Sequence, residues 1–175
     1  MLEVEAKVKV EDLVSIQSFL EREGAERLGE SVQKDIYFNA PHRDFGETDE
    51  ALRVRYADDE AVVTYKGPKI GLTGIKAREE INLDVKRGDR AEMIVERLGF
   101  RRTAVIIKHR IEYRWQETTI ELDEVEGLGT YIEIEVLCED GGEAASKKIE
   151  QVKRDLGIEG KNITASYLEL FLSTQ

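Results

Sequence analysis

The chain has 175 residues, of which 41% are hydrophobic and 36% are charged, and its formal net charge is −11. This length is typical of one domain, so we expect a single domain over residues 1–175. The composition excludes a disordered chain, and the absence of an apolar run of about 20 residues excludes a membrane-spanning helix. The acidic balance argues against binding to nucleic acid, while the single cysteine, Cys138, excludes an internal disulfide framework and is typical of the cytoplasm.

The first half of the chain consists mainly of predicted strands. Apolar and charged residues alternate strictly over Leu2–Val10, which predicts a strand rather than the apolar core of a signal peptide. Residues 11–23 carry apolar side chains at helical spacing, and Gly24 is a typical helix stop. Four further strands are predicted, over Glu30–Asn39, Ala51–Ala57, Ala61–Lys66 and Lys76–Lys86.

The second half combines strands with helices. A short helix is predicted over Arg90–Leu98 and ends at Gly99. Four strands follow, over Arg101–Ile107, Lys108–Gln116, Thr118–Val125 and Thr130–Leu137. The last two predicted elements are helices, over Gly142–Leu156 and Ile163–Leu172. Many successive antiparallel strands with attached helices indicate an α+β fold, in which such a long sheet must be closed or covered.

The informative feature of these strands is the face opposite their apolar residues. Nearly every position on that face is fully charged, and residues of one sign occur in pairs two positions apart, which point the same way on a strand. The acidic pairs are Glu3/Glu5, Glu121/Asp123 and Glu133/Glu135, and the basic pairs are Arg53/Arg55 and Lys108/Arg110. One interpretation is that these faces are simply exposed to water, as is common in antiparallel sheets.

A closed barrel offers a second interpretation. Two carboxylates about 5 Å apart repel by roughly 3 kcal/mol at an effective dielectric constant near 20, so converging acidic pairs need a cation. Carboxylate oxygens without Cys or His suit Mg²⁺ or Mn²⁺, and the basic pairs suit a chain of phosphates. We therefore expect a closed antiparallel β-barrel of about eight strands, with its charged faces inward, room for a small ligand and helices packed outside.

Several motifs along the whole chain also favour a closed barrel with a charged interior. The segment "EVEAK" holds Glu3, Glu5 and Lys7, and it is followed by "QKDIYF", "ALRVR", "TYKGP", "AREEI", "KHR", "ELDEVEGLGTYIEIE" and "SYLELF". Together these motifs resemble the ExExK signature and later motifs of the CYTH superfamily, the triphosphate tunnel metalloenzymes. This resemblance implies an eight-stranded antiparallel tunnel, a divalent metal and a triphosphate-bearing substrate.

The resemblance also implies roles for single residues. The positions that resemble metal-binding acids are Glu3, Glu5, Glu133 and Glu135, with Glu121 and Asp123 beside them. The positions that resemble phosphate-binding residues are Lys7, Arg53, Arg55, Lys66, Arg78, Lys108 and Arg110, of which Lys7, Arg53, Arg55 and Lys66 are also expected to act in catalysis. Glu80 is a further candidate, and the Ser166–Tyr167 segment resembles a plug that closes one tunnel mouth.

Three functions are compatible with these residues. A triphosphatase directs water to the terminal phosphoryl group, whereas a class IV adenylyl cyclase directs the ribose 3′-hydroxyl of ATP to the α-phosphorus. Such cyclases typically carry a His-Phe pair upstream of ExExK, and only Met1 and Leu2 precede Glu3 here, so we favour the triphosphatase. A noncatalytic module that binds polyphosphate or nucleotides is the third. The expected partner is a small-molecule triphosphate, without nucleic acid or membrane, and a homodimer is left open.

Overall fold

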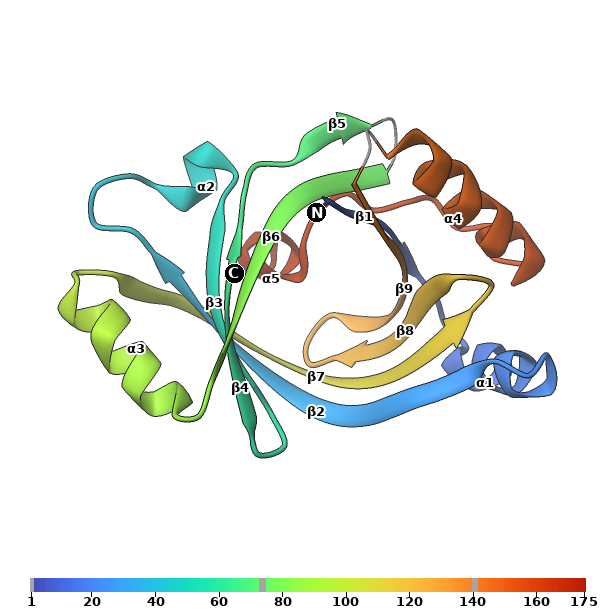
Figure 1. The fold of residues 1–175 in the computed structure, drawn as a ribbon, viewed down its shortest axis with the longest axis horizontal. Helices are drawn as coiled ribbons and strands as arrows, with labels where there is room; N and C mark the ends of the chain where they lie inside the picture. Colours follow the sequence, from blue (N-terminus) through green and yellow to red (C-terminus); the bar gives the residue numbers. More distant parts are fainter. Residues whose placement is uncertain (1, 73–74, 140–141) are drawn as a thin grey trace.

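The strands of the protein curve around a central opening (Figure 1) in the computed structural model, which describes residues 2–72, 75–139 and 142–175. The strands are β1 (Leu2–Lys9), β2 (Glu26–Asn39), β3 (Ala51–Ala57), β4 (Glu60–Lys66), β5 (Ile70–Leu72), β6 (Ile75–Val85), β7 (Arg101–Trp115), β8 (Thr118–Val125) and β9 (Gly129–Cys138). The helices are α1 (Leu13–Arg22), α2 (Phe45–Thr48), α3 (Gly88–Arg97), α4 (Glu143–Asp155) and α5 (Tyr167–Ser173).

Antiparallel pairing closes these strands into a barrel. Their order around the wall is β1-β9-β8-β7-β2-β3-β4-β6, and β6 pairs back onto β1. The short β5 pairs with β6 beyond the end of β4, so it extends the same edge of the wall. The predicted closed, eight-stranded antiparallel barrel with helices packed outside is therefore confirmed.

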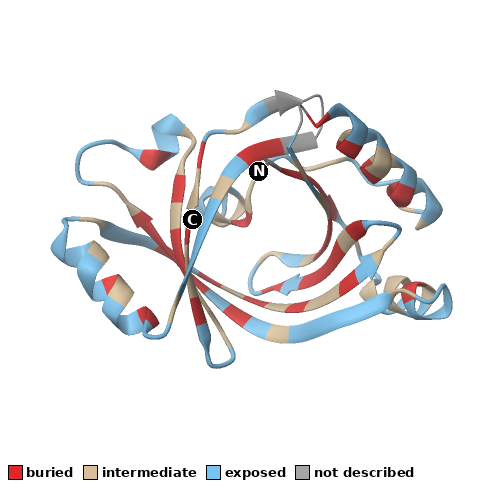
Figure 2. Ribbon diagram, viewed as in Figure 1, coloured by how far each residue is buried: buried red, intermediate tan, exposed pale blue. Residues whose placement is uncertain are grey.

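Strand alternation sends apolar and charged side chains to opposite sides of the wall. On β1, Val4 and Val8 point outward and are at most 1% exposed, because helices cover this part of the barrel. Glu5 and Lys7, on the other parity, line the interior cavity and are also buried. Residues 3–8 of β1 are all buried, and Figure 2 shows many buried residues on the strands around the barrel opening. The apolar core thus lies between wall and helices, and the interior is left for charge.

Helices α1 and α4 supply much of this core. Asp12 begins α1, where its side chain accepts a 2.9 Å hydrogen bond from the backbone N–H of Ser15. The Phe19 ring then packs edge-on against Trp115 of β7, with 5.8 Å between the ring centres. The buried Ile149 of α4 packs into the same cluster as the outward residues of β1 and β9.

Helix α3 covers the other side of the barrel. A Cβ atom at Gly88 would lie 2.4 Å from the Tyr56 ring, so only glycine lets the helix start this close to β3. Each helix in the described ranges is too short or too polar to cross a membrane.

Some predicted boundaries were wrong. Residues 101–115 form one strand, β7, rather than two, because no turn residue interrupts the alternation and β2 pairs along the whole length. The last helix begins at Tyr167 instead of Ile163, because the Ile163 N–H is bound to the Lys7 carbonyl at 2.7 Å. Strand β2 starts four residues before its predicted first residue, Glu30, and α2 and β5 were not predicted.

Candidate functional site

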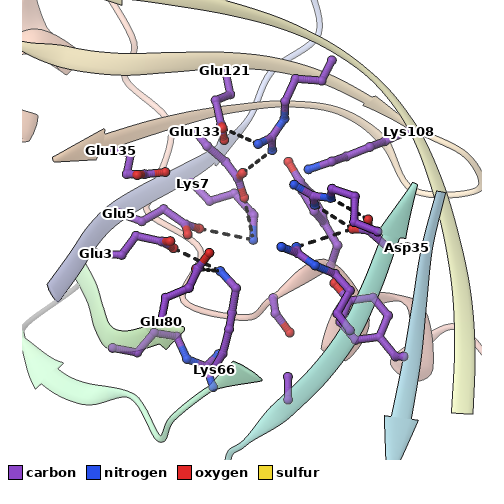
Figure 3. A pocket seen from close by; sticks show the side chains of 18 residues that line it. Glu3, Glu5, Lys7, Asp35, Lys66, Glu80, Lys108, Glu121, Glu133 and Glu135 are labelled. Carbon is purple, nitrogen blue, oxygen red and sulfur yellow. Dashed lines mark hydrogen bonds and ion pairs between the residues drawn. The ribbon is translucent and has the colours of Figure 1, made fainter. Parts of the chain in front are cut away.

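The barrel interior holds a cavity of about 170 Å³ with a strongly charged lining (Figure 3). Among the described residues, its acidic lining side chains are Glu3, Glu5, Asp35, Glu80, Glu121, Glu133 and Glu135. Its basic lining side chains are Lys7, Arg53, Arg55, Lys66, Arg78, Lys108 and Arg110. The structure therefore brings together all of the predicted phosphate-binding residues and all but one of the predicted metal-binding acids. The exception, Asp123, lies fully buried behind the lining, in contact with Arg110 and Lys108.

One side of the cavity, the acidic wall, consists of five of the predicted metal-binding acids, Glu3, Glu5, Glu121, Glu133 and Glu135, on adjacent strands β1, β9 and β8, with Asp123 of β8 behind them. The antiparallel register places Glu5 opposite Glu135, and Glu133 opposite Glu121. Burial and the nearby Glu5 carboxylate raise the pKa of Glu135 to about 7. Burial and a hydrogen bond with Glu80 raise the pKa of Glu3 to about 9. Burial is the largest cause of both raised pKa values, and the neighbouring carboxylates add to it.

Two cations of the chain itself neutralise part of the acidic wall. Arg110 contacts Glu121, donates to Asp123 from Nε at 2.7 Å, and donates to Glu133 from Nη2 at 2.7 Å. Lys7 Nζ lies 3.1 Å from a Glu133 oxygen. Burial alone would raise the pKa of Glu133, but Lys7 and Arg110 hold it well below its ordinary value.

The acidic wall also has the chemistry of a metal site. Glu121, Asp123 and Glu133 each offer a carboxylate oxygen, and these oxygens all lie within 4.8 Å of one another. The donors are carboxylates without sulfur or imidazole, which suits a hard divalent cation. The donor set therefore fits a hard divalent cation, and Arg110 contacts all three of these acids.

The opposite side, the basic wall, consists of Arg53, Arg55, Lys66, Arg78 and Lys108, on strands β3, β4, β6 and β7. Arg55 donates from Nε and Nη2 to the two carboxylate oxygens of Asp35, both at 2.7 Å, and Arg53 lies 3.6 Å from the same carboxylate. Burial would raise the pKa of Asp35, but the two guanidinium groups hold it well below its ordinary value. Burial and Arg110 lower the pKa of Lys108 to about 8.

Two residues of the basic wall are fixed at the junction with the acidic wall. Lys66 lies 3.2 Å from Glu3 and 2.5 Å from Glu80. Burial would lower the pKa of Lys66, but its acidic neighbours, Glu3 first, raise it to about 12. Arg78 donates to the backbone carbonyls of Gly67 and Asp49, both at 2.7 Å, so its head group is held at one end of the cavity.

Sequence reasoning missed Asp35 and Tyr37 as lining residues. Both lie on β2, on the parity that faces the interior, within the motif "QKDIYF". The signal was present, since a lone acid and a tyrosine alternate there with apolar residues.

The comparisons with known proteins agree with this geometry. The CYTH domain family matches residues 1–167. The chain belongs to the CYTH family. It is 39% identical over 173 residues to the "Putative adenylate cyclase MJ0240" of Methanocaldococcus jannaschii, covering 97% of this chain and 98% of that protein. Its fold matches the PH1819 protein of Pyrococcus horikoshii with a TM-score of 0.88 and 40% identity over 99% of each chain.

A more distant match extends the likeness in fold. A protein of Hippeastrum, titled a "Putative adenylyl cyclase" that "reveals a dominant triphophatase activity", has a TM-score of 0.75 at 22% identity, with 99% of this chain and 96% of that chain covered. CYTH proteins are divalent-metal-dependent triphosphatases or adenylyl cyclases that bind small triphosphate-bearing substrates. The family thus supplies an enzyme class, either triphosphatase or adenylyl cyclase.

Proposed function

We propose that the protein is a divalent-metal-dependent triphosphatase that binds an inorganic or organic triphosphate in its barrel. The observation that carries this proposal is the buried cavity between an acidic and a basic wall. Its whole lining counts seven acidic and seven basic side chains among the described residues, so the formal charges of the cavity lining balance. A metal–triphosphate complex also joins two positive charges to a polyanion, so each wall meets charge of the opposite sign.

We assign the groups as follows. Carboxylates of the acidic wall would hold the divalent cation, which when bound would neutralise phosphoryl oxygens and activate water for attack. Arg53 and Arg55 bind the phosphate chain and stabilise the charge that develops on the transferred phosphoryl group. Lys7 and Lys66 lie beside the metal-binding acids, and their positive charges stabilise the reacting phosphoryl group. The remaining cations that bind the phosphate chain are Arg78, Lys108 and Arg110.

A second candidate is a class IV adenylyl cyclase. The observation in its favour is the name of the M. jannaschii relative, which is 39% identical over almost the full length of both chains. Both reactions need the same bound triphosphate and differ in the nucleophile. A noncatalytic polyphosphate-binding module would need the same basic wall, without turnover.

One activity panel separates these candidates. ATP, GTP, thiamine triphosphate and tripolyphosphate are incubated with the protein and Mg²⁺ or Mn²⁺, and the products are resolved by chromatography. We expect orthophosphate and a diphosphate from at least one substrate, with no cyclic nucleotide. Cyclic AMP with pyrophosphate would instead identify a cyclase. If every substrate remained intact, the noncatalytic binding module would be the remaining candidate. An Arg55→Ala variant prepared alongside controls for contaminating phosphatases.

A further inference from the structure

The C-terminal segment reaches the charged cavity through Tyr167, the first residue of α5. Its side chain is 6% exposed and lines the cavity together with the two walls. Its hydroxyl donates to Asp123 Oδ2 at 2.8 Å, so the ring has a fixed orientation in the cavity. Tyr131 of β9 packs edge-on against the ring, with 5.3 Å between the ring centres.

Two lysines of the cavity contact this ring. Lys7 Nζ lies 4.2 Å from the ring centre, and Lys108 Nζ lies 4.9 Å from it. Both distances are within the range of cation–π attraction, and both ammonium groups are almost completely buried, so water screens the attraction little. Lys7 is on β1 and Lys108 on β7, which are separated in the wall by two strands. The ring is thus a shared contact of two cations from different parts of the barrel.

The backbone before α5 strengthens this link. Lys7 Nζ also donates to the Ala165 carbonyl at 3.0 Å, and the Lys7 carbonyl accepts from the Ile163 N–H at 2.7 Å. Asp123 Oδ2 accepts hydrogen bonds from both the Tyr167 hydroxyl, at 2.8 Å, and Lys108 Nζ, at 3.2 Å. The segment therefore touches each lysine directly and also the carboxylate that holds Lys108.

We propose that Tyr167 is a positioning residue, whose ring holds the ammonium groups of Lys7 and Lys108 in place for the phosphate chain. Lysine side chains lose considerable rotational entropy when they are fixed, and groups fixed before binding lose less when the ligand arrives. The site is then incomplete without the C-terminal segment. The part of this inference that concerns phosphate rests on the function proposed above, whereas the restraint on the lysines does not.

Three variants test the ring separately from the helix. Tyr167→Phe keeps the ring and removes the hydroxyl, and Tyr167→Leu removes the ring. Phe171→Leu is the matched control, because Phe171 packs in the same apolar cluster from the same helix but does not line the cavity. Thermal melts of all three report how far each variant weakens the packing of α5.

Binding and kinetics measure the consequence for phosphate. Titration calorimetry with tripolyphosphate, without metal, is expected to show about tenfold weaker binding for Tyr167→Leu, from the loss of two cation–π contacts. Tyr167→Phe should stay within about threefold of the wild type, because Asp123 keeps its bonds to Arg110 and Lys108. In turnover with Mn²⁺, Tyr167→Leu should lower kcat/KM mainly by raising KM, with kcat little changed.

Nuclear magnetic resonance measures the restraint without any ligand. In protein labelled at lysine, the ε-protons of Lys7 and Lys108 should be shifted upfield by the ring, with assignments from Lys7→Arg and Lys108→Arg. Relaxation of their ε-carbons should indicate ordered side chains in the wild type and in Tyr167→Phe, and mobile ones in Tyr167→Leu.

Three results would overturn the inference: unshifted lysine protons in the wild type, lysines equally ordered in Tyr167→Leu, or equal loss of affinity in Phe171→Leu. If the wild type shows the restraint but neither binds nor hydrolyses triphosphates, the proposed function fails while the positioning of the two lysines is supported.

Discussion

The acidic wall and the basic wall differ in how far the chain neutralises each of them. On the basic wall, Asp35 is shared by Arg53 and Arg55, and its pKa is held well below the ordinary value. On the acidic wall, Arg110 and Lys7 neutralise Glu133, but the pKa of Glu135 is raised to about 7. The acidic wall is therefore the side that still needs a cation.

This difference predicts that the two walls respond differently to phosphate and to metal. Arg55 and Asp35 are already paired, so an incoming phosphate adds to arginines whose orientation is set. A divalent cation instead reduces the repulsion among the closely spaced carboxylates of the acidic wall. The basic wall should thus bind a polyanion without metal, whereas the acidic wall should show its function only when metal is present.

The largest effect is expected from removing one charge of the acidic wall. Glu135→Gln should lower metal-dependent turnover by at least about 100-fold, as the loss of a metal ligand typically does. The same change relieves repulsion with Glu5, so the melting temperature should be unchanged or higher. Initial rates at saturating Mn²⁺ and thermal melts measure the two effects. Glu124→Gln, at an exposed position on the outward parity of β8, is the control. Turnover within a few-fold of the wild type would remove Glu135 from the metal site.

The next effect tests whether the basic wall acts alone. Tripolyphosphate without metal should raise the melting temperature, because a ligand that binds only the folded state stabilises it. At about 100 times its Kd the gain is about 2.7 kcal/mol, which is several degrees for a domain of this size. Orthophosphate at equal concentration should do far less, since it spans only part of the cavity. Equal shifts from both anions, or none from either, would show that these cations do not converge on one phosphate chain.

The barrel was predictable because strand alternation is a local property. The strict parity of β1 and β9 assigns each residue to the inner or outer side before any pairing is known. Boundaries depend on partners instead: β7 continues through Ile107 because β2 pairs along it, and Ile163 is held extended by Lys7. Such long-range pairing leaves no local signal.

The site was predictable as a set of charges and not as a set of contacts. Parity places Arg110 inside the barrel, but its insertion between Glu121 and Glu133 depends on the stagger of β7, β8 and β9. Tyr167 was noticed only as part of a plug, because its contact with Lys7 joins the two ends of the chain.

A smaller effect is expected on the affinity for tripolyphosphate when an arginine of the basic wall, rather than an exposed arginine, is replaced. Arg55→Ala should weaken metal-free binding of tripolyphosphate about tenfold, through lost charge-assisted hydrogen bonds. Arg114→Ala should not change it, because Arg114 is exposed and lies 3.8 Å from Glu26 outside the cavity. Calorimetry measures both. Since Arg55→Ala also leaves Asp35 with a single partner, Asp35→Asn in the same background should recover stability without recovering affinity. Similar affinities for Arg55→Ala and Arg114→Ala would contradict the assignment.

The smallest effect is the pH dependence of the metal-free protein, and its sign follows from Glu135. The pKa of this carboxyl is raised from 4.5 to about 7 by burial and Glu5, so the folded protein holds the proton more tightly than the unfolded chain does. The free energy of unfolding should therefore fall as pH rises from 4.5 to about 7, and the stability that comes from this carboxyl is completely lost above that range.

The full pKa shift of Glu135 corresponds to about 3 kcal/mol, and partial access of solvent reduces this to about 1 kcal/mol. Asp35 and Glu133, whose pKa values are lowered, contribute stability that is lost only as pH falls, outside this window. Glu3, whose pKa is raised to about 9, adds a loss of the same sign that continues to higher pH, so the variant isolates the part due to Glu135. Urea denaturation at steps of pH should give a flatter curve for Glu135→Gln than for the wild type, and Mg²⁺ should flatten the wild-type curve in the same direction, because a cation favours the deprotonated carboxylate. Parallel curves for the two proteins would show that the pKa of Glu135 is not raised in the folded protein.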